Sequence, residues 1–169
     1  DAVGAGLVEL FRDRVRAAIQ SWEDANCNPF QNYCPAALNS SGARGQITAT
    51  GTAFLLRDDL VLRGSSMPSG SFASIIFGDA RAFVANPGGS AGNLCVGGAI
   101  GRLFDSLGTT SSTGTLTFGV DNGNLATSSG GPFTLFPGDQ LMFQWWFRDT
   151  DQSGNATSNF TNAVEVTFI

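Results

Sequence analysis

The sequence predicts a mainly β protein, an antiparallel β-sandwich of about seven or more strands preceded by one N-terminal amphipathic α-helix. Three observations lead to this fold class. Short runs rich in Val, Ile, Thr, Phe and Trp follow one another from residue 47, and clusters of Gly, Pro, Asn and Asp separate them. An apolar pattern with helical period occupies residues 1–23. Strands and helices do not alternate along the chain, so a parallel sheet is not expected.

The composition agrees with a single exported domain. The chain has 169 residues, of which 42% are hydrophobic, enough to fill one core. Charged residues make up only 14%, against the ~25% of an average globular protein. Uncharged polar residues and Gly must therefore cover most of the surface, as is common in secreted bacterial β-proteins.

Two missing residue types exclude many activities. The chain contains no His and no Lys, so all nine cations are Arg. Without His there is no imidazole general base and no His metal ligand, and without Lys there is no Schiff base or phosphate-loop lysine. We therefore expect no enzyme and no catalytic residues. A net charge of −5 also argues against a nucleic-acid partner.

Residues 1–23 are predicted to form the amphipathic helix. Apolar side chains recur there at steps of three and four residues, and the charged ones fall mostly on the other side. This apolar face packs either on the chain's own sandwich or on a neighbouring subunit, because an isolated helix of this length is marginal. Membrane insertion is not expected, since no stretch is apolar enough to span a bilayer. The candidate self-association residues are Val8, Phe11, Val15, Ile19 and Trp22.

Residues 24–46 are predicted to be a linker, rich in Pro, Asn, Ser and Gly. Cys27 and Cys34 are seven residues apart in it, a comfortable spacing for a local disulfide. This pairing predicts an oxidising compartment, extracellular or at the cell surface. Cys95 is then left over, either as a small buried side chain or as the partner of an N-terminal Cys.

Residues 47–169 are predicted to be the β-sandwich domain. The turn signals MPSG, NPGG, DNGN, SSGG and FPGD divide it into candidate strands. These are ITATGTAFLL, LVLRG, FASIIF, RAFVA, TLTFGV, LMFQWWF and AVEVTFI. The last of them is suited to be an edge strand, or a strand that is exchanged with a neighbouring subunit.

The stretch GNLCVGGAIGRLF at residues 92–104 invites a chemical interpretation. A nucleophilic Cys95 needs a neighbour that lowers its pKa, and the chain has no His for this. A phosphate loop needs a Lys in register, which is absent as well. We interpret the stretch as architecture, in which the glycines permit tight turns and close backbone approach.

The run LMFQWWFRD offers a candidate ligand face. Leu141, Phe143, Trp145 and Phe147 alternate with a second set, so a strand places the two sets on opposite faces. The first set is a core face. The second set includes Gln144, Trp146 and Arg148, the types that bind sugars or form interface hot spots. Alternatively, a loop or the N-terminal helix covers Trp146.

A calcium loop is a secondary possibility at the end of this run. Asp149, Asp151 and Ser153 have the oxygen spacing of the start of such a loop, with Gly154 at the turn. The bidentate Glu at the twelfth position is missing, because Phe160 stands there. Asp and Gly in this order also form ordinary β-turns, so we expect no metal and no other cofactor.

Three motifs resemble a known family. NPGGSAGNLCVGGAIGRL (86–103), GDQLMFQWWFRD (138–149) and SNFTNAVEVTF (158–168) are similar to a β-rich domain of secreted proteins in Planctomycetes and some myxobacteria. Its members read N-L-C-[LV]-G-G-x-I-x-R, then F-Q-x-W-[YF]-R-D, then N-F-[ST]-[DN]-A-x-x-V-T-F. The resemblance covers residues 50–169 and implies export and a surface role. It implies no activity and no catalytic residues.

These observations predict a secreted or cell-surface structural protein. We expect it to associate with copies of itself, as a filament, appendage or surface-layer subunit, through the N-terminal helix and the open strand edges. The alternative is an extracellular carbohydrate-binding module that uses the Trp/Gln/Arg face.

Overall fold

The computed structural model describes residues 12–16, 29–123, 125 and 134–169. Its strands are all paired antiparallel. In chain order the elements are β1 (Phe30–Tyr33), β2 (Gln46–Thr50), β3 (Val61–Ser65), β4 (Phe72–Gly78), β5 (Ala80–Ala85), the 3-10 turn η1 (Pro87–Gly89), β6 (Asn93–Gly97), β7 (Gly101–Thr109), β8 (Leu116–Gly119), β9 (Gln140–Thr150) and β10 (Ala156–Thr167). The predicted mainly β class is therefore confirmed.

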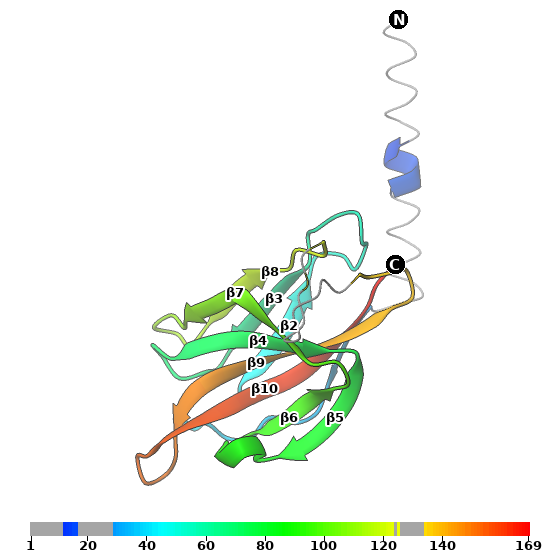
Figure 1. Cartoon of the computed structure of the whole chain (residues 1–169). Coiled ribbons are helices and arrows are strands. Elements are labelled where there is room, and N and C mark those ends of the chain that lie inside the picture. Colours follow the sequence, from blue (N-terminus) through cyan, green and yellow to red (C-terminus); the bar gives the residue numbers. More distant parts are fainter. Residues whose placement is uncertain (1–11, 17–28, 124, 126–133) are drawn as a thin grey trace, which may run out of the picture.

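The strands form three sheets (Figure 1). The largest has the order β1-β10-β9-β4-β7, a second has the order β2-β3-β8, and β5 and β6 form a third. The main core contains residues of the five-stranded and the three-stranded sheets, such as Trp145 and Phe143 on one side and Ile47 and Leu62 on the other. Two sheets that share one core give a β-sandwich-like arrangement.

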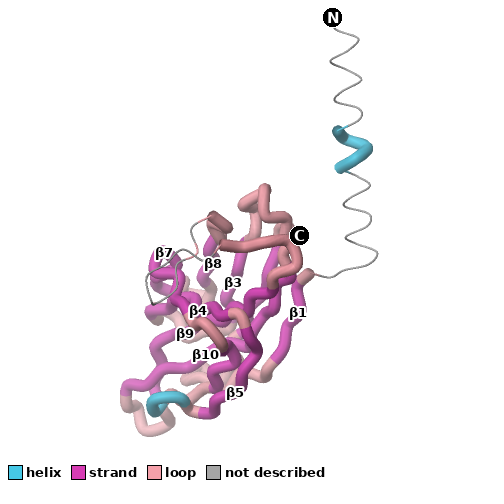
Figure 2. Tube along the Cα trace, turned by 45° about the vertical axis from the view of Figure 1, so that its right-hand side comes forward, coloured by secondary structure: helices cyan, strands magenta, loops and turns pink. Residues whose placement is uncertain are grey.

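The other face of the five-stranded sheet carries a smaller apolar cluster. It joins Ile76, Met142 and Phe160 of that sheet to Val96 of β6. The chain reaches this face directly after β4, where Asp79 separates the end of β4 from β5. The β5–β6 pair lies beside β10 in Figure 1, and Figure 2 also shows β5 beside β10. It therefore covers only part of this face.

The segment predicted as a linker contributes to the sheet, so that prediction is wrong for residues 30–33. β1 pairs with the C-terminal half of β10, with Phe30 opposite Val166 and Tyr33 opposite Ala163. Phe30 packs against the main core, and the Asn32 side chain donates a hydrogen bond to the carbonyl oxygen of Ile47 (2.7 Å). β1 therefore closes one edge of the five-stranded sheet.

The predicted Cys27–Cys34 disulfide is wrong. Cys34 is bonded to Cys95, with 6.3 Å between the Cα atoms and 61 residues between them in sequence. Pairing with β10 brings the end of β1 to β6, so a distant Cys lies closer than sequence spacing indicates. The structure thus agrees with the second interpretation of Cys95, in which it pairs with an N-terminal Cys. Cys27 lies outside the described residues.

Only residues 12–16 of the predicted helix are described, and they are helical and exposed. Val15 has 41% of its surface accessible. Val8, Phe11, Ile19 and Trp22 lie outside the described residues. No helix in the described part of the chain is long and apolar enough to cross a membrane.

Candidate functional site

The two faces of β9 have different surroundings. Leu141, Phe143, Trp145 and Phe147 are completely buried in the main core, as the alternation predicts. On the opposite face, Met142 is buried beneath the β5–β6 pair, whereas Trp146 is partly buried and Arg148 is exposed. This face is therefore covered at one end of the strand and open at the other.

Gln144 does not belong to a ligand face, which corrects the prediction. Its side chain is completely buried. Its oxygen accepts a hydrogen bond from the Cys95 backbone N–H (2.9 Å), and its nitrogen donates to the carbonyl oxygens of Asn93 (3.0 Å) and Thr161 (2.7 Å). Gln144 therefore joins β6 to the five-stranded sheet and, because it is completely buried, presents no hydrogen-bonding atom to a ligand.

Trp146 and Arg148 do lie together, and Arg102 of β7 joins them. The guanidinium carbons of Arg102 and Arg148 each lie 5.3 Å from the centre of the Trp146 ring, which is within the range of a cation–π contact. We call these three residues the Trp146 site. One side of the indole also packs on the apolar cluster that contains Phe160 and Val96.

The strand register explains how Arg102 reaches Trp146. Ile76 of β4 stands opposite Gln144 on one side and opposite Arg102 on the other, so all three point to the same face. Ser74, which is also on β4, stands opposite Trp146 of β9. Because the Ser74 side chain is small, the long side chain of Arg102 can cross β4 from β7 and reach the Trp146 ring.

Among the residues that the structure describes, neither arginine of the Trp146 site has a carboxylate partner. The ion pairs of the described residues are Arg16–Asp13 and Arg81–Glu165. Arg102 also lines a hollow of about 260 Å³ at the β7 edge, in which Phe104, Asp105 and Asp121 take part, yet no ion pair forms there. The two guanidinium groups therefore keep their hydrogen-bond donors for solvent or a ligand.

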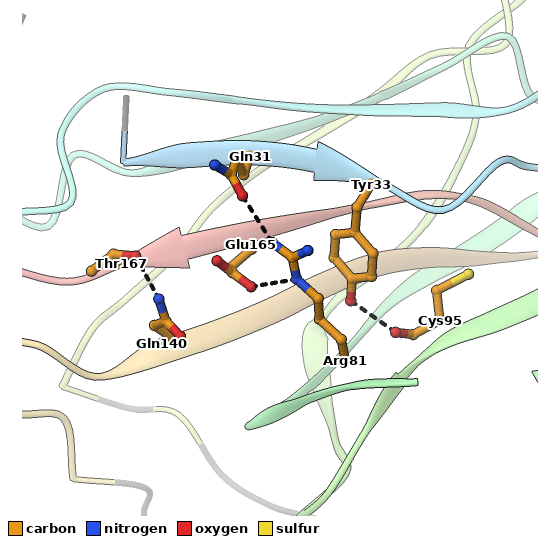
Figure 3. A network of polar contacts seen from close by, with 7 residues as sticks. All are labelled: Gln31, Tyr33, Arg81, Cys95, Gln140, Glu165 and Thr167. Carbon is orange, nitrogen blue, oxygen red and sulfur yellow. Dashed lines mark hydrogen bonds and ion pairs between the residues drawn. The ribbon is translucent and has the colours of Figure 1, made fainter. Parts of the chain in front are cut away.

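A second group of polar residues crosses from β5 to β1 and β10 (Figure 3). Arg81 Nε donates to Glu165 (2.6 Å), and its Nη2 donates to Gln31 (2.8 Å). The guanidinium carbon lies 4.7 Å from the centre of the Tyr33 ring. The hydrogen bond to Glu165 raises the pKa of Arg81, so the cation is retained at every relevant pH.

Tyr33 completes this group. Its hydroxyl donates a hydrogen bond to the carbonyl oxygen of Cys95 (2.8 Å). Burial raises the pKa of Tyr33 to about 12, against a smaller opposing effect of the Arg81 charge. Because Arg81, Glu165 and Tyr33 satisfy one another, we interpret the group as a connection between sheets.

The residues proposed for calcium serve separate structural purposes. The Asp149 carboxylate is buried and accepts hydrogen bonds from the Ser40 and Thr150 backbone N–H groups and from the Asn159 amide. Asp151 lies in the β9–β10 turn, where hydrogen bonds from the Asn155 side chain and backbone lower its pKa. Ser153 donates its backbone N–H to Asp151. No group of three or more Cys, Asp or Glu within the described ranges is arranged to hold a metal ion.

Sequence reasoning missed Arg102, Arg81 and Glu165. Arg102 stands in the glycine-rich stretch interpreted as architecture, and no local pattern connects it to Trp146. The contact depends on the pairing of β4 with both β7 and β9, which only the fold supplies.

Comparison of the chain with protein-family models, curated proteins and solved structures finds no match.

Proposed function

We propose that this chain is an exported structural protein that associates with copies of itself through the edge strand β7. The observation that carries the proposal is the combination of an outer strand with exposed apolar side chains. β7 is the last strand of the five-stranded sheet, and Phe104 and Leu107 on it are 69% and 61% exposed. Phe72 on neighbouring β4 is 59% exposed.

Large exposed apolar side chains on an outer strand are unusual on a protein that acts alone. Natural sheets protect their outer strands with charges, Pro or bulges, because an unpaired strand accepts a strand from another chain. β7 carries two of these protections, namely the exposed charges of Arg102 and Asp105 and an irregularity opposite β4 between the pairs Ala73–Gly108 and Ile75–Leu103. The Ser106 hydroxyl fills it by accepting a hydrogen bond from the Ile75 backbone N–H (2.8 Å). Phe104 and Leu107 remain outside, where a second copy would cover them.

Export is favoured by the Cys34–Cys95 disulfide, because such bonds persist mainly in oxidising compartments. The predicted N-terminal helix supplies a second candidate contact. Val15 is accessible in the described part of that helix. Changing Val15 to Asp tests this second contact separately from β7.

The mass of the full chain in solution tests the proposal. Light scattering and negative-stain imaging over a range of concentrations should find assemblies larger than the monomer. Phe104→Asp and Leu107→Asp should shift the population to monomers. Leu56→Asp is the matched control, because Leu56 is 89% exposed in the segment between β2 and β3. A wild-type chain that remains monomeric at every concentration would refute self-association.

A further inference from the structure

We propose that the Trp146 site binds an acidic glycan, a sugar chain that carries carboxylate or sulfate groups. The site presents two guanidinium groups beside one indole ring, each at 5.3 Å from the ring centre. This activity does not require self-association, although the two surfaces adjoin because Arg102 and Phe104 are both on β7.

The charges define the kind of ligand. Two cations beside one ring repel each other, and the attraction of the ring for each of them is only ~1 kcal/mol at an exposed position. An anionic group between Arg102 and Arg148 would remove this repulsion and accept charge-assisted hydrogen bonds from both. Because neither arginine forms an ion pair in the described part of the chain, both guanidinium groups can pair with a ligand anion.

The indole favours a sugar over a free inorganic ion. A small anion would use the two guanidinium groups alone, whereas a pyranose also presents an apolar C–H face to aromatic carbon. Trp146 is partly exposed and held in place by the apolar cluster with Phe160 and Val96, so its orientation is fixed before binding.

The position on the fold also suits a chain-like ligand. The covering β5–β6 pair lies beside Met142 at one end of this face, and Arg148 is near the opposite end of β9. Arg102 and Arg148 come from β7 and β9, with β4 between them. A ligand that contacts both arginines therefore lies across the open part of the sheet, where several sugar units can follow one another.

Titration of the full chain, followed by calorimetry and tryptophan fluorescence, tests the proposal. The charged probes are oligogalacturonate and dextran sulfate. Their neutral counterparts are fully methyl-esterified oligogalacturonate and unmodified dextran. We expect at least one charged probe to bind and both neutral probes to fail. Sodium sulfate and polyglutamate show whether a free anion or an acidic peptide is the true ligand.

Variants connect binding to the site. Arg102→Gln and Arg148→Gln should each weaken binding about tenfold, the usual loss for one charge-assisted hydrogen bond. Trp146→Phe keeps an aromatic ring in the apolar cluster and should weaken binding severalfold. Arg63→Gln, an exposed arginine of β3 in the other sheet, makes the same change in net charge and should alter affinity less than twofold.

Four results would each overturn the proposal. These are failure of both charged glycans to bind, equal binding of the neutral counterparts, equal binding of sulfate or polyglutamate, and an equal loss in Arg63→Gln. Thermal unfolding of each variant checks that the fold is retained. The uncharged edge variant Leu107→Ser should bind glycan as the wild type does, because it removes an exposed apolar side chain of β7 and adds no charge near the two arginines.

Discussion

The hydroxyl of Tyr33 donates a hydrogen bond to the carbonyl oxygen of Cys95, 2.8 Å away, directly beside the disulfide that joins Cys34 to the same residue. Tyr33, the last residue of β1, and Cys34, which follows it, thus both hold Cys95 of β6. The five-stranded sheet and the β5–β6 pair are connected here by a covalent bond, a hydrogen bond and the nearby Arg81–Glu165 ion pair. This connection fixes the cover on the face that carries Trp146.

Removal of the disulfide should destabilise the protein strongly. For a loop closed over 61 residues, the chain-entropy model gives about 4 kcal/mol. We expect the double variant Cys34→Ala/Cys95→Ala to lose about that much free energy of unfolding in urea. Cys27→Ala is the control and should change stability little. Peptide mapping without reduction should recover Cys34 linked to Cys95, and a Cys27–Cys34 peptide would contradict the structure.

Stability should fall at alkaline pH because of Tyr33. Its pKa is raised from 10.0 to about 12 in the folded protein, so the unfolded chain loses this proton first. The resulting stability is complete below pH 10 and is lost as the pH rises towards about 12. The chain has one Tyr, so ultraviolet absorbance of tyrosinate reports this residue alone.

Tyr33→Phe is the control for this alkaline effect. It lacks the titrating hydroxyl and the hydrogen bond to Cys95, so its unfolding free energy should decrease less between these two pH values. A tyrosinate titration of the wild type centred at the ordinary value would show that Tyr33 is not buried as described.

Gln144 should be essential for stability and should play no part in ligand binding. Gln144→Leu fills a similar volume but leaves the Cys95 N–H and the Asn93 and Thr161 carbonyl groups without their partner. We expect a loss of about 3 kcal/mol in unfolding free energy, since buried polar groups without partners are costly. Gln140→Leu is the control on the same strand, because Gln140 is exposed and bonds only Thr167 (3.2 Å). Equal stability of the two variants would contradict the assigned role.

The elements with a clear period were predictable from sequence. The alternation in β9 identifies its buried face, because a strand with one side in a core repeats every two residues. β1 was missed because it has four residues among Pro, Asn and Cys, too few to show a period. Its place depends on pairing with β10, more than a hundred residues later in the chain.

Two interpretations failed because they relied on sequence distance or on residue type. Cys27 was preferred as the partner of Cys34 for its nearness in sequence, but sheet pairing brings Cys95 closer. Gln144 is polar and was therefore placed on an open face, whereas the β5–β6 pair covers it and uses its amide as a link. Neither the cover nor the position of Arg102 could be inferred before the strand order was known.

Residues of the glycine-rich stretch at 92–104 pack closely against β4. β6 approaches β4 so closely that a Cβ at Gly78 would lie 2.8 Å from the Val96 side chain and would collide with the Gly97 carbonyl oxygen. Gly78→Ala should therefore push β6 away and destabilise the protein by about 2 kcal/mol, the usual cost of overpacking. Gly119→Ala is the control, because a Cβ there has no neighbour within 4 Å. Urea unfolding should find the control within about 0.5 kcal/mol of the wild type.

If Gly78→Ala unfolds at the same urea concentration as the control, the β5–β6 pair does not pack on β4 at this distance. If it is destabilised as expected, faster amide exchange in β6 than in β3 would locate the damage in the cover of the Trp146 face.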